Sequence, residues 1–259
     1  MVLKRLLSAW SQGREARALQ RRAIPDDLWQ LTLMRYPFLA LRSAADVAEL
    51  RRLSSLFLAA KEFHGVGGFE VTDEVAVAVA AQACLPVLRL GLSWYDGFVG
   101  IVMHADEVVA QREFTDEDGV VHQYEEALAG EAMDGGPLML TWTATEAPEF
   151  DDGIFNVVIH EFAHVIDMRD GFADGVPPLA SNAARDAWIA VIDAEWDAFC
   201  ARVDAGEATL IDPYGAESIE EFFAVAVEAL FVAPAELQAE QPALHRLLAD
   251  FFFQQTERA

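Results

Sequence analysis

The sequence predicts an α+β fold that is mostly helical and contains a small mixed sheet. Three observations support this: helical apolar periodicity towards both ends of the chain, short apolar runs bounded by Gly or Pro in its middle, and a hydrophobic content of 53% over 259 residues. That content is ample for a core, and no stretch resembles an interdomain linker. We therefore expect a single domain over residues 23–259.

The N-terminal part of this predicted domain is expected to be helical. Residues 24–41 show a helical pattern, with Pro25 where a first helical turn accepts proline. Residues 43–63 are strongly amphipathic, and the glycine-rich segment 64–68 interrupts them. Thr72, followed by two acidic residues, is typical of the start of another helix.

The middle of the chain changes to short apolar runs that are typical of strands. GFVGIVMH at residues 97–104 and PLMLTW at residues 137–142 are both bounded by Gly or Pro. Between them, Asp118 and Gly119 form a turn signal. We expect the small sheet to be built in this region.

The last hundred residues are predicted to return to helices. A helix over residues 154–168 follows Asp151 and Asp152 and ends near Gly171. The remaining predicted helices start at Asn182, at Ser218 and after Pro242, and the first two end at Gly206 and before Pro234.

The charge balance limits the classes of partner. With 18 basic and 43 acidic residues, the formal net charge is -25, so the surface repels phosphate backbones and direct nucleic-acid binding is not expected. Residues 1–22 are a basic leader that we expect to be disordered or solvated rather than a docking arm, and they contain no apolar core of a signal peptide. No stretch approaches the roughly 20 apolar residues of a membrane span.

The two cysteines indicate a reducing compartment. Cys84 and Cys200 lie far apart in apolar, helical-looking stretches, so buried free thiols are expected and a disulfide framework is excluded. Together with the leader and the lack of a membrane span, this predicts a cytoplasmic protein.

His160, Glu161 and His164 form an H-E-x-x-H motif within the predicted helix at 154–168. Residues i and i+4 lie on one face of a helix, so both imidazoles can reach one zinc ion. Glu161 points about a quarter turn away, towards the water that the metal binds. Zinc lowers the pKa of that water towards ~7, and Glu161 takes its proton during attack on a peptide carbonyl. The motif therefore predicts one Zn2+ per chain, with Glu161 as the general base.

A catalytic zinc site needs a third protein ligand and an open position, and three carboxylates are candidates. Asp170 has the spacing of the third ligand in H-E-x-x-H-x-x-G-x-x-H enzymes, but Asp167 replaces the glycine that turns the chain there. Glu221 and Glu228 are seven residues apart on one predicted helix and share a face, so periodicity does not choose between them. Glu221 also completes a capping box that begins at Ser218, which would fold its side chain back onto the helix start.

Asp167 has two interpretations of its own. Metal-binding histidines usually donate their other N–H to a carboxylate or a carbonyl, which makes Asp167 a candidate partner of His164, one turn earlier. The alternative is a surface acid at the C-terminal end of the helix.

Several separate segments resemble, in the right order, the Mlc titration factor A family of bacterial zinc peptidases. The resemblance extends from Ile24 to Phe253. The matching segments are GFEVTDEVAVAVAAQACLPVL (68–88), LGLSWYDGF (90–98), LAGEAMDGGPLMLTW (128–142), NVVIHEFAHVID (156–167) and YGAESIEEFFAVAVEALF (214–231).

This family is similar in its catalytic core to gluzincin metallopeptidases, so the resemblance implies a zincin-like core whose third zinc ligand is a glutamate on a later helix. In the family pattern Y-A-A-T-x-P-A-E-x-F-A-V that glutamate falls on Glu221. Tyr214 falls on the tyrosine, whose hydroxyl is implied to hydrogen-bond the tetrahedral oxyanion. The chain departs from the family at Ile219 and Glu220, where Pro-Ala is usual, and at Met133, where an aromatic residue is common after G-E-A.

In related peptidases an edge strand beside the metal pairs with the extended substrate. The resemblance implies that residues 137–142 are this strand and bind the substrate backbone by β-addition, with Gly135 and Gly136 leaving room for it. The alternative is an ordinary core strand.

Two functions follow from these residues and this resemblance. The first is a zinc-dependent metallopeptidase, aminopeptidase-like, that hydrolyses peptide bonds with a zinc-activated water and Glu161 as the general base. The alternative is a regulatory binding protein that sequesters an Mlc-like transcriptional repressor, with or without catalysis. The H-E-x-x-H motif, a third ligand and Tyr214 favour chemistry, because binding alone would not need them. A purely structural zinc site is disfavoured, because such sites usually have four Cys or His ligands.

Overall fold

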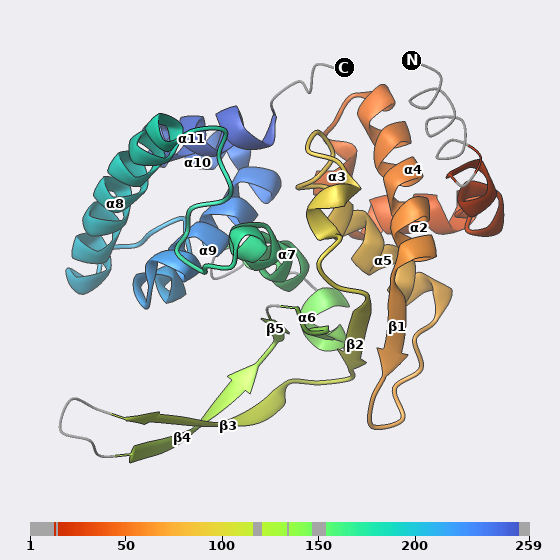
Figure 1. Cartoon of the computed structure of the whole chain (residues 1–259), viewed down its shortest axis with the longest axis horizontal. Coiled ribbons are helices and arrows are strands. Elements are labelled where there is room, and N and C mark those ends of the chain that lie inside the picture. The colour runs from red at the N-terminus through yellow and green to blue at the C-terminus, as the bar shows by residue number, and fades with distance from the viewer. Residues whose placement is uncertain (1–12, 14, 116–120, 134, 147–153, 254–259) are drawn as a thin grey trace.

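The computed structural model describes residues 13, 15–115, 121–133, 135–146 and 154–253, with the side chains of residues 110–127 excepted. Its helices gather into two groups on either side of a central helix, α7, and a small sheet lies beside that helix (Figure 1). This mostly helical arrangement with a mixed sheet confirms the predicted α+β class.

Two helices of the first group begin where the sequence predicted, but the helix predicted over residues 24–41 is divided at Tyr36 into two. Ser43 Oγ accepts a hydrogen bond from the backbone N–H of Asp46 at 3.2 Å, and Thr72 Oγ1 accepts one from Val75 at 3.3 Å. Each side chain satisfies a backbone donor that the first helical turn leaves unpaired. The helices of this group are α2 (Asp26–Arg35), α3 (Pro37–Ala40), α4 (Ala44–Ala60) and α5 (Asp73–Cys84).

Part of the predicted basic leader is helical. Residues 15–21 form a helix, and the Glu15 carboxylate makes an ion pair with Arg52 of α4. This part of the leader therefore contacts the first helical group, whereas residues 1–12 and 14 lie outside the described part of the chain.

The main sheet is mixed, and its strand order corrects one prediction. In the described residues the order is β1-β2-β6-β5; β1, β2 and β6 are parallel, and β5 runs antiparallel to β6. Residues 137–142, predicted to be the edge strand, contain β6, which lies between two neighbours. The two edges are β1 and β5, and β5 is the edge strand that contacts α7. The strands are β1 (Glu62–Gly65), β2 (Gly100–His104), β5 (Gly130–Ala132) and β6 (Leu138–Thr141).

β1 was not predicted, because the apolar periodicity of α4 continues to Phe63. The helix ends at Lys61, which is extended at φ -107 and ψ 151. Its ammonium group donates to the backbone carbonyls of Tyr95 and Phe98, contacts that lie far away in the sequence. A tertiary contact therefore turns the chain into β1 where local periodicity would extend the helix.

A second, two-stranded sheet projects from the body of the molecule (Figure 1). In the chain it lies between β2 and β5. It consists of β3 (Val108–Thr115) and β4 (Val121–Leu128), which are antiparallel and in register from Val108–Leu128 to Thr115–Val121. The predicted turn at Asp118 and Gly119 lies outside the described residues. Two short helices complete this region, η1 (Leu92–Tyr95) and α6 (Trp142–Glu146).

The central helix α7 spans Val157–Asp167 and continues as η2 (Met168–Asp170) to Gly171, close to its predicted end. Its N-cap is Asn156, whose Oδ1 accepts from the N–H of Ile159 at 2.9 Å. The predicted start at residue 154 is three residues too early, because residues 154–156 are not helical, whereas Asp151 and Asp152 lie outside the described residues. On one face, Phe162 packs against the rings of three residues of the first half of the chain, with centroid distances of 5.7, 4.8 and 5.9 Å to Phe57, Tyr95 and Phe98. The opposite face is left for α9.

The second helical group closes the other side of α7. Ser181 and Ser218 cap its two longest helices, and α9 is buried from Phe222 to Val232. Pro234 ends α9 as predicted but also begins α10, which was not predicted. The helices are α8 (Asn182–Asp204), η3 (Pro213–Ala216), α9 (Ile219–Val232), α10 (Pro234–Glu240) and α11 (Pro242–Phe252).

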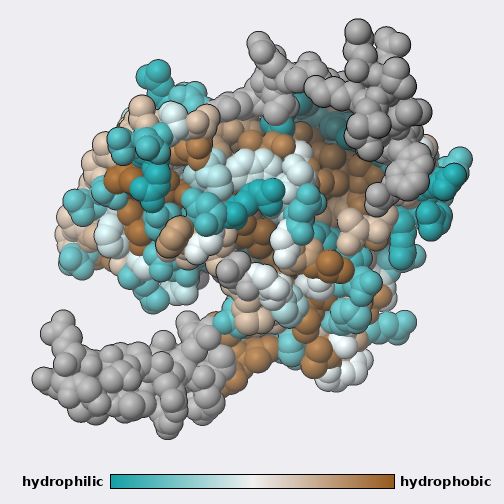
Figure 2. Space-filling model, in the orientation of Figure 1, coloured by the Kyte–Doolittle hydropathy of each residue, from teal (hydrophilic) through white to brown (hydrophobic). Residues whose placement is uncertain are grey.

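The surface and the cysteines partly follow the sequence predictions. Hydrophilic residues are spread over much of the described surface on the face shown in Figure 2, in keeping with the net charge of -25. Cys84 is buried as predicted, but Cys200 is only half-buried. Among the described residues, no helix is both long enough and apolar enough to cross a membrane.

Candidate metal centre

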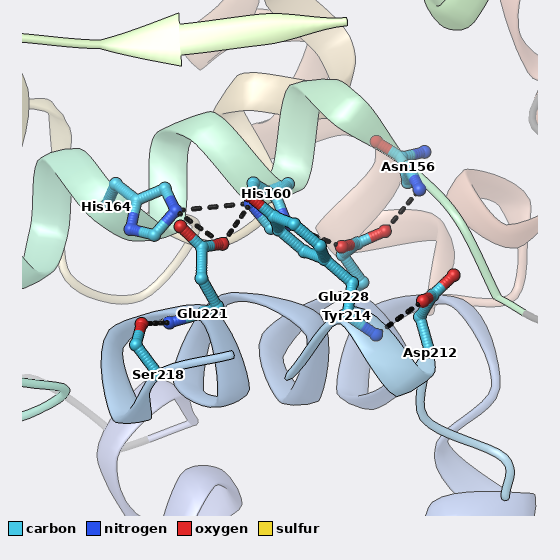
Figure 3. A network of polar contacts seen from close by, with 8 residues as sticks. All are labelled: Asn156, His160, His164, Asp212, Tyr214, Ser218, Glu221 and Glu228. Atoms are coloured by element: carbon cyan, nitrogen blue, oxygen red, sulfur yellow. Dashed lines mark hydrogen bonds and ion pairs between the residues drawn. The ribbon is translucent and has the colours of Figure 1, made fainter. Parts of the chain in front are cut away.

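Three polar side chains from α7 and α9 converge near the centre of the molecule (Figure 3). The Nε2 atoms of His160 and His164 lie 3.1 Å apart. Glu221 Oε2 lies 3.0 Å from the first and 3.3 Å from the second. The structure therefore brings together both histidines of the H-E-x-x-H motif and one of its three candidate carboxylates.

The hydrogen bonds around this cluster fit a bound cation. Glu228 Oε1 lies 2.8 Å from His160 Nδ1, so in neutral His160 the proton sits on Nδ1 and the lone pair on Nε2. Glu221 Oε2 is buried and makes no hydrogen bond of acceptable geometry within the described part of the chain. This oxygen and the Nε2 atoms of the two imidazoles converge on one small space, and a cation between them would compensate for the burial of the carboxylate. Two imidazole nitrogens and one carboxylate oxygen are the donor set of an open, catalytic zinc site.

The acid–base properties of the cluster reflect the same crowding. Burial alone would lower the pKa of His160, but the Glu221 and Glu228 carboxylates outweigh it and raise that pKa well above its usual value. Burial opposes ionisation of Glu221, yet the two adjacent imidazoles lower its pKa well below the usual range. The Glu221 and Glu228 carboxylates therefore stabilise a positive charge at His160.

Glu228 was a candidate third zinc ligand, but in the structure it contacts Nδ1 of His160 and not the two Nε2 atoms. It is fully buried, and one carboxylate oxygen accepts from His160 Nδ1 while the other accepts the backbone N–H of Asn156. Burial raises the pKa of Glu228, and the interaction with His160 partly offsets this. Glu228 is thus the carboxylate that fixes the ring orientation and tautomer of His160, not a third partner of the Nε2 atoms.

Two further residues that the sequence interpretation missed extend this hydrogen-bond network to α5. Asn156 Nδ2 donates to Gln82 Oε1 at 2.7 Å, and both side chains are buried. Asn156 thereby caps α7, supports Glu228 through its backbone and contacts α5 through its side chain. The available signal was an N-cap residue type directly before the H-E-x-x-H helix; nothing local marked Gln82.

Glu161 is 5% exposed and faces a cavity of about 270 Å³ that His160 and Tyr214 also line. Burial raises the pKa of Glu161, and the two histidines partly offset this. The N-terminal end of β5 passes directly beside it: a Cβ at Gly130 would lie 2.5 Å from Glu161 Oε1. A side chain at residue 130 would therefore displace the Glu161 carboxylate from its observed position.

Tyr214 lies at the opening of the same cavity. It belongs to η3, its ring centroid is 6.2 Å from that of His160, and it is 40% exposed. Its position depends on Gly215, because a Cβ there would lie 2.7 Å from Val225 of α9. Asp212 Oδ1 accepts the Tyr214 N–H at 2.8 Å and fixes the turn (Figure 3).

The capping box predicted at Ser218 forms only in part. Ser218 Oγ accepts from the backbone N–H of Glu221 at 3.4 Å. The Glu221 side chain does not fold back, because its carboxylate is directed at His160 and His164 (Figure 3). One residue therefore takes part in the cap through its backbone and in the cluster through its side chain.

The two remaining candidate acids lie outside the cluster. Asp170 is exposed, and its carboxylate accepts from the backbone N–H of Phe172 at 3.3 Å. Asp167 is fully buried, so the surface interpretation is wrong, and its carboxylate accepts from the Gly175 N–H at 2.9 Å. Burial raises the pKa of Asp167 to about 6. Its observed role is to hold the loop that precedes α8.

Comparisons with known proteins agree with this arrangement. Residues 10–253 match the model of a family described as glucose-regulated metallo-peptidase M90. An uncharacterized protein of Synechocystis is 36% identical over 248 residues, which cover 94% of this chain and 89% of that protein. Proteins named Mlc titration factor A are 34% identical: that of Cronobacter sakazakii over 87% of this chain and 85% of its own length, and that of Salmonella typhi over 84% and 83%.

Proposed function

The chain belongs to the glucose-regulated metallo-peptidase M90 family and is related to the Mlc titration factor A proteins, and from this premise we propose that it is a zinc-dependent peptidase with a zincin-like core. His160, His164 and Glu221 are its proposed metal ligands, and Glu161 is its general base. The observation that carries the proposal is the convergence of two Nε2 atoms and one buried carboxylate oxygen on a single point.

A bound zinc ion would supply Lewis acidity, which polarises the substrate carbonyl and lowers the pKa of water. The protein supplies the proton transfers. Glu161 borders the cavity beside His160, where it accepts the proton of the attacking water. Having accepted that proton, Glu161 can pass it to the departing amine.

The substrate is proposed to bind as an extended strand along β5. This replaces the prediction for β6, which already has a neighbour on each side. Within the described residues β5 is the edge of the sheet that contacts α7, and Gly130 lies against Glu161. Backbone hydrogen bonds to an edge strand hold a peptide irrespective of its sequence, which brings its carbonyl group beside the general base.

Tyr214 is proposed to donate a hydrogen bond to the oxyanion that forms on the attacked carbonyl. Replacing it by phenylalanine should lower kcat roughly 10²- to 10³-fold, the effect of removing one such donor. KM and zinc content should change little, because the ring and its packing remain. Steady-state kinetics with a chromogenic amino-acid anilide, alongside metal analysis, measure this. A fall in kcat of less than twofold would remove Tyr214 from the mechanism.

The proposed function is tested by removing and restoring the metal. Protein dialysed against a chelator should lose hydrolysis of peptide amides, and one equivalent of Zn2+ should restore it. Mass spectrometry of the products also shows whether cleavage starts at the N-terminus, as the aminopeptidase-like interpretation expects. Full activity in metal-free protein would refute a zinc peptidase.

The second candidate function is binding of an Mlc-like repressor protein, with or without catalysis. The observation that favours it is the name of two relatives, Mlc titration factor A, at 34% identity. A pull-down with metal-free and zinc-loaded protein shows whether such a partner binds and whether the metal matters. Absence of capture in both states would leave the peptidase as the sole candidate.

A further inference from the structure

A second cavity, of about 120 Å³, lies at the other end of β5. It is separate from the cavity at Glu161, because no residue lines both. Its walls come from the end of β5 and the turn into β6, from the end of α7 with η2, and from η1 with the segment after it. The residues that matter here are Trp94, Phe98, Met133, Val165, Met168 and Arg169.

The two cavities border neighbouring positions on the same strand and on the same helix. Along the strand, Gly130 borders the first cavity and Ala132 the second, a separation of two residues or about 6.6 Å. Along the helix, Glu161 borders the first and Val165 the second, a separation of four residues or about 6 Å. Successive side chains on one face of an extended peptide are also two residues apart. A peptide whose carbonyl lies at Glu161 therefore places a nearby side chain at the second cavity.

The second cavity has the size and the chemistry of a site for one apolar side chain. Phe98 and Leu138 in its wall are buried, and Met133 at its edge is 47% exposed. An apolar protein cavity of roughly 150 Å³ binds benzene; this cavity is somewhat smaller but open on one side, so it suits an aliphatic side chain or an aromatic ring that is only partly enclosed.

The wall formed by Trp94 is fixed without a ligand. Arg169 donates to the Trp94 carbonyl at 3.2 Å, and its guanidinium lies 5.6 Å from the Trp94 ring centroid. The Trp94 ring also packs edge-on against the ring of Phe251, with the two ring centroids 5.6 Å apart. Because these contacts already hold the Trp94 side chain in place, a side chain that enters the cavity does not cost the entropy of ordering this wall.

We propose that this cavity is a specificity pocket that binds a bulky apolar side chain of the peptide substrate, such as Leu or Phe, within two residues of the cleaved bond. The inference rests on the proposed function and adds a substrate class to it. Pockets of this kind discriminate by the apolar groups that they bury, so peptides with Leu should be preferred over those with Ala by roughly tenfold or more in kcat/KM.

Gly97→Leu tests the pocket by filling it. Gly97 lines the cavity, its φ is not positive, and a Cβ there meets nothing within 4 Å, so the fold should tolerate the change. The test uses matched peptides with Leu or Ala at each position within two residues of the cleaved bond. In the variant, the ratio of kcat/KM for the Leu peptide to that for the Ala peptide should fall by roughly tenfold or more, while cleavage of the Ala peptide is retained. Gly13→Leu, at an exposed glycine with equally open surroundings, is the matched control and should behave as the wild type.

Met133→Lys provides a second, independent variant, because it places a charge at the edge of the pocket. It should weaken the preference for Leu, whereas Met34→Lys, at a methionine that is 70% exposed on α2, should not. Calorimetric binding of the Leu and Ala peptides to Glu161→Gln protein, with and without Gly97→Leu, measures the same preference without catalysis.

The outcomes separate this inference from the proposed function. Peptide cleavage without a preference for Leu, or with a preference that Gly97→Leu and Met133→Lys leave intact, overturns the pocket and leaves the peptidase standing. If no peptide is cleaved, the proposed function fails and binding decides: tighter binding of the Leu peptide that Gly97→Leu removes supports the pocket, and equal or no binding overturns it.

Discussion

Replacing Glu161 by glutamine should lower kcat for peptide hydrolysis by roughly 10²- to 10⁴-fold, the usual contribution of a positioned general base. The amide retains the shape of the side chain beside Gly130 but cannot accept the proton of the attacking water. Zinc content should stay unchanged, because Glu161 contributes none of the three atoms that converge on the metal position. Single-turnover kinetics and metal analysis on the same preparation measure both quantities.

Glu220→Gln is a matched control for this variant. Glu220 is an acidic residue next to Glu221, only half-buried, and it contributes no atom to the cluster. It should retain wild-type activity and zinc content. Full activity of Glu161→Gln would show that the assigned base is wrong, and loss of zinc from it would show that Glu161 helps to hold the metal.

Replacing Glu221 by alanine should abolish stoichiometric zinc binding, whereas replacing Glu228 should weaken it without abolishing it. Glu221 Oε2 approaches both Nε2 atoms, but Glu228 contacts the opposite nitrogen of His160. Residues in the position of Glu228 usually change metal affinity by roughly 10- to 100-fold. Equilibrium dialysis with zinc over a range of concentrations distinguishes loss of a ligand from loss of affinity.

Glu228→Gln is the informative form of the second substitution. Glu228 is fully buried and accepts from both His160 and the backbone of Asn156, so alanine would leave two buried donors without an acceptor. Glutamine retains an acceptor for one of them, and a loss of stability can be followed separately by thermal unfolding. If Glu228→Gln removed zinc entirely and Glu221→Ala retained it, Glu228 would be the third ligand.

The part of the site that lies within one helix could be predicted from the sequence. His160, Glu161 and His164 are brought together by helical geometry alone, so their spacing was sufficient. The choice between Glu221 and Glu228 was not available from periodicity, because both lie on the face of α9 that meets α7. Their positions along that face distinguish them: Glu221 contacts Nε2 of His160, and Glu228 contacts Nδ1.

The order of the strands illustrates what local patterns omit. The apolar run of β6 was recognised, but its neighbours are set by pairing with β2 and β5, and β5 is only three residues long. Gly130–Ala132 carries no β-branched or aromatic residue that would mark it as a strand. Its place beside Glu161 depends on the absence of a side chain at Gly130, a requirement that appears only once α7 is packed against it.

The helices were predicted best where a cap residue marks their start. Ser43, Thr72 and Ser218 each accept from the backbone of the first turn, as their residue types indicate. The end of α4 was missed, because the contacts that turn the chain at Lys61 come from residues more than 30 positions later.

The central claim is that His160, His164 and Glu221 hold one zinc ion, and a crystal structure with anomalous data on both sides of the zinc absorption edge tests it most directly. The account predicts one zinc peak at roughly 2.0–2.2 Å from Nε2 of each histidine and from the Glu221 carboxylate, with Glu228 remaining on His160 Nδ1. No zinc peak at this position in protein saturated with the metal, or a peak coordinated by Glu228 in place of Glu221, would contradict it.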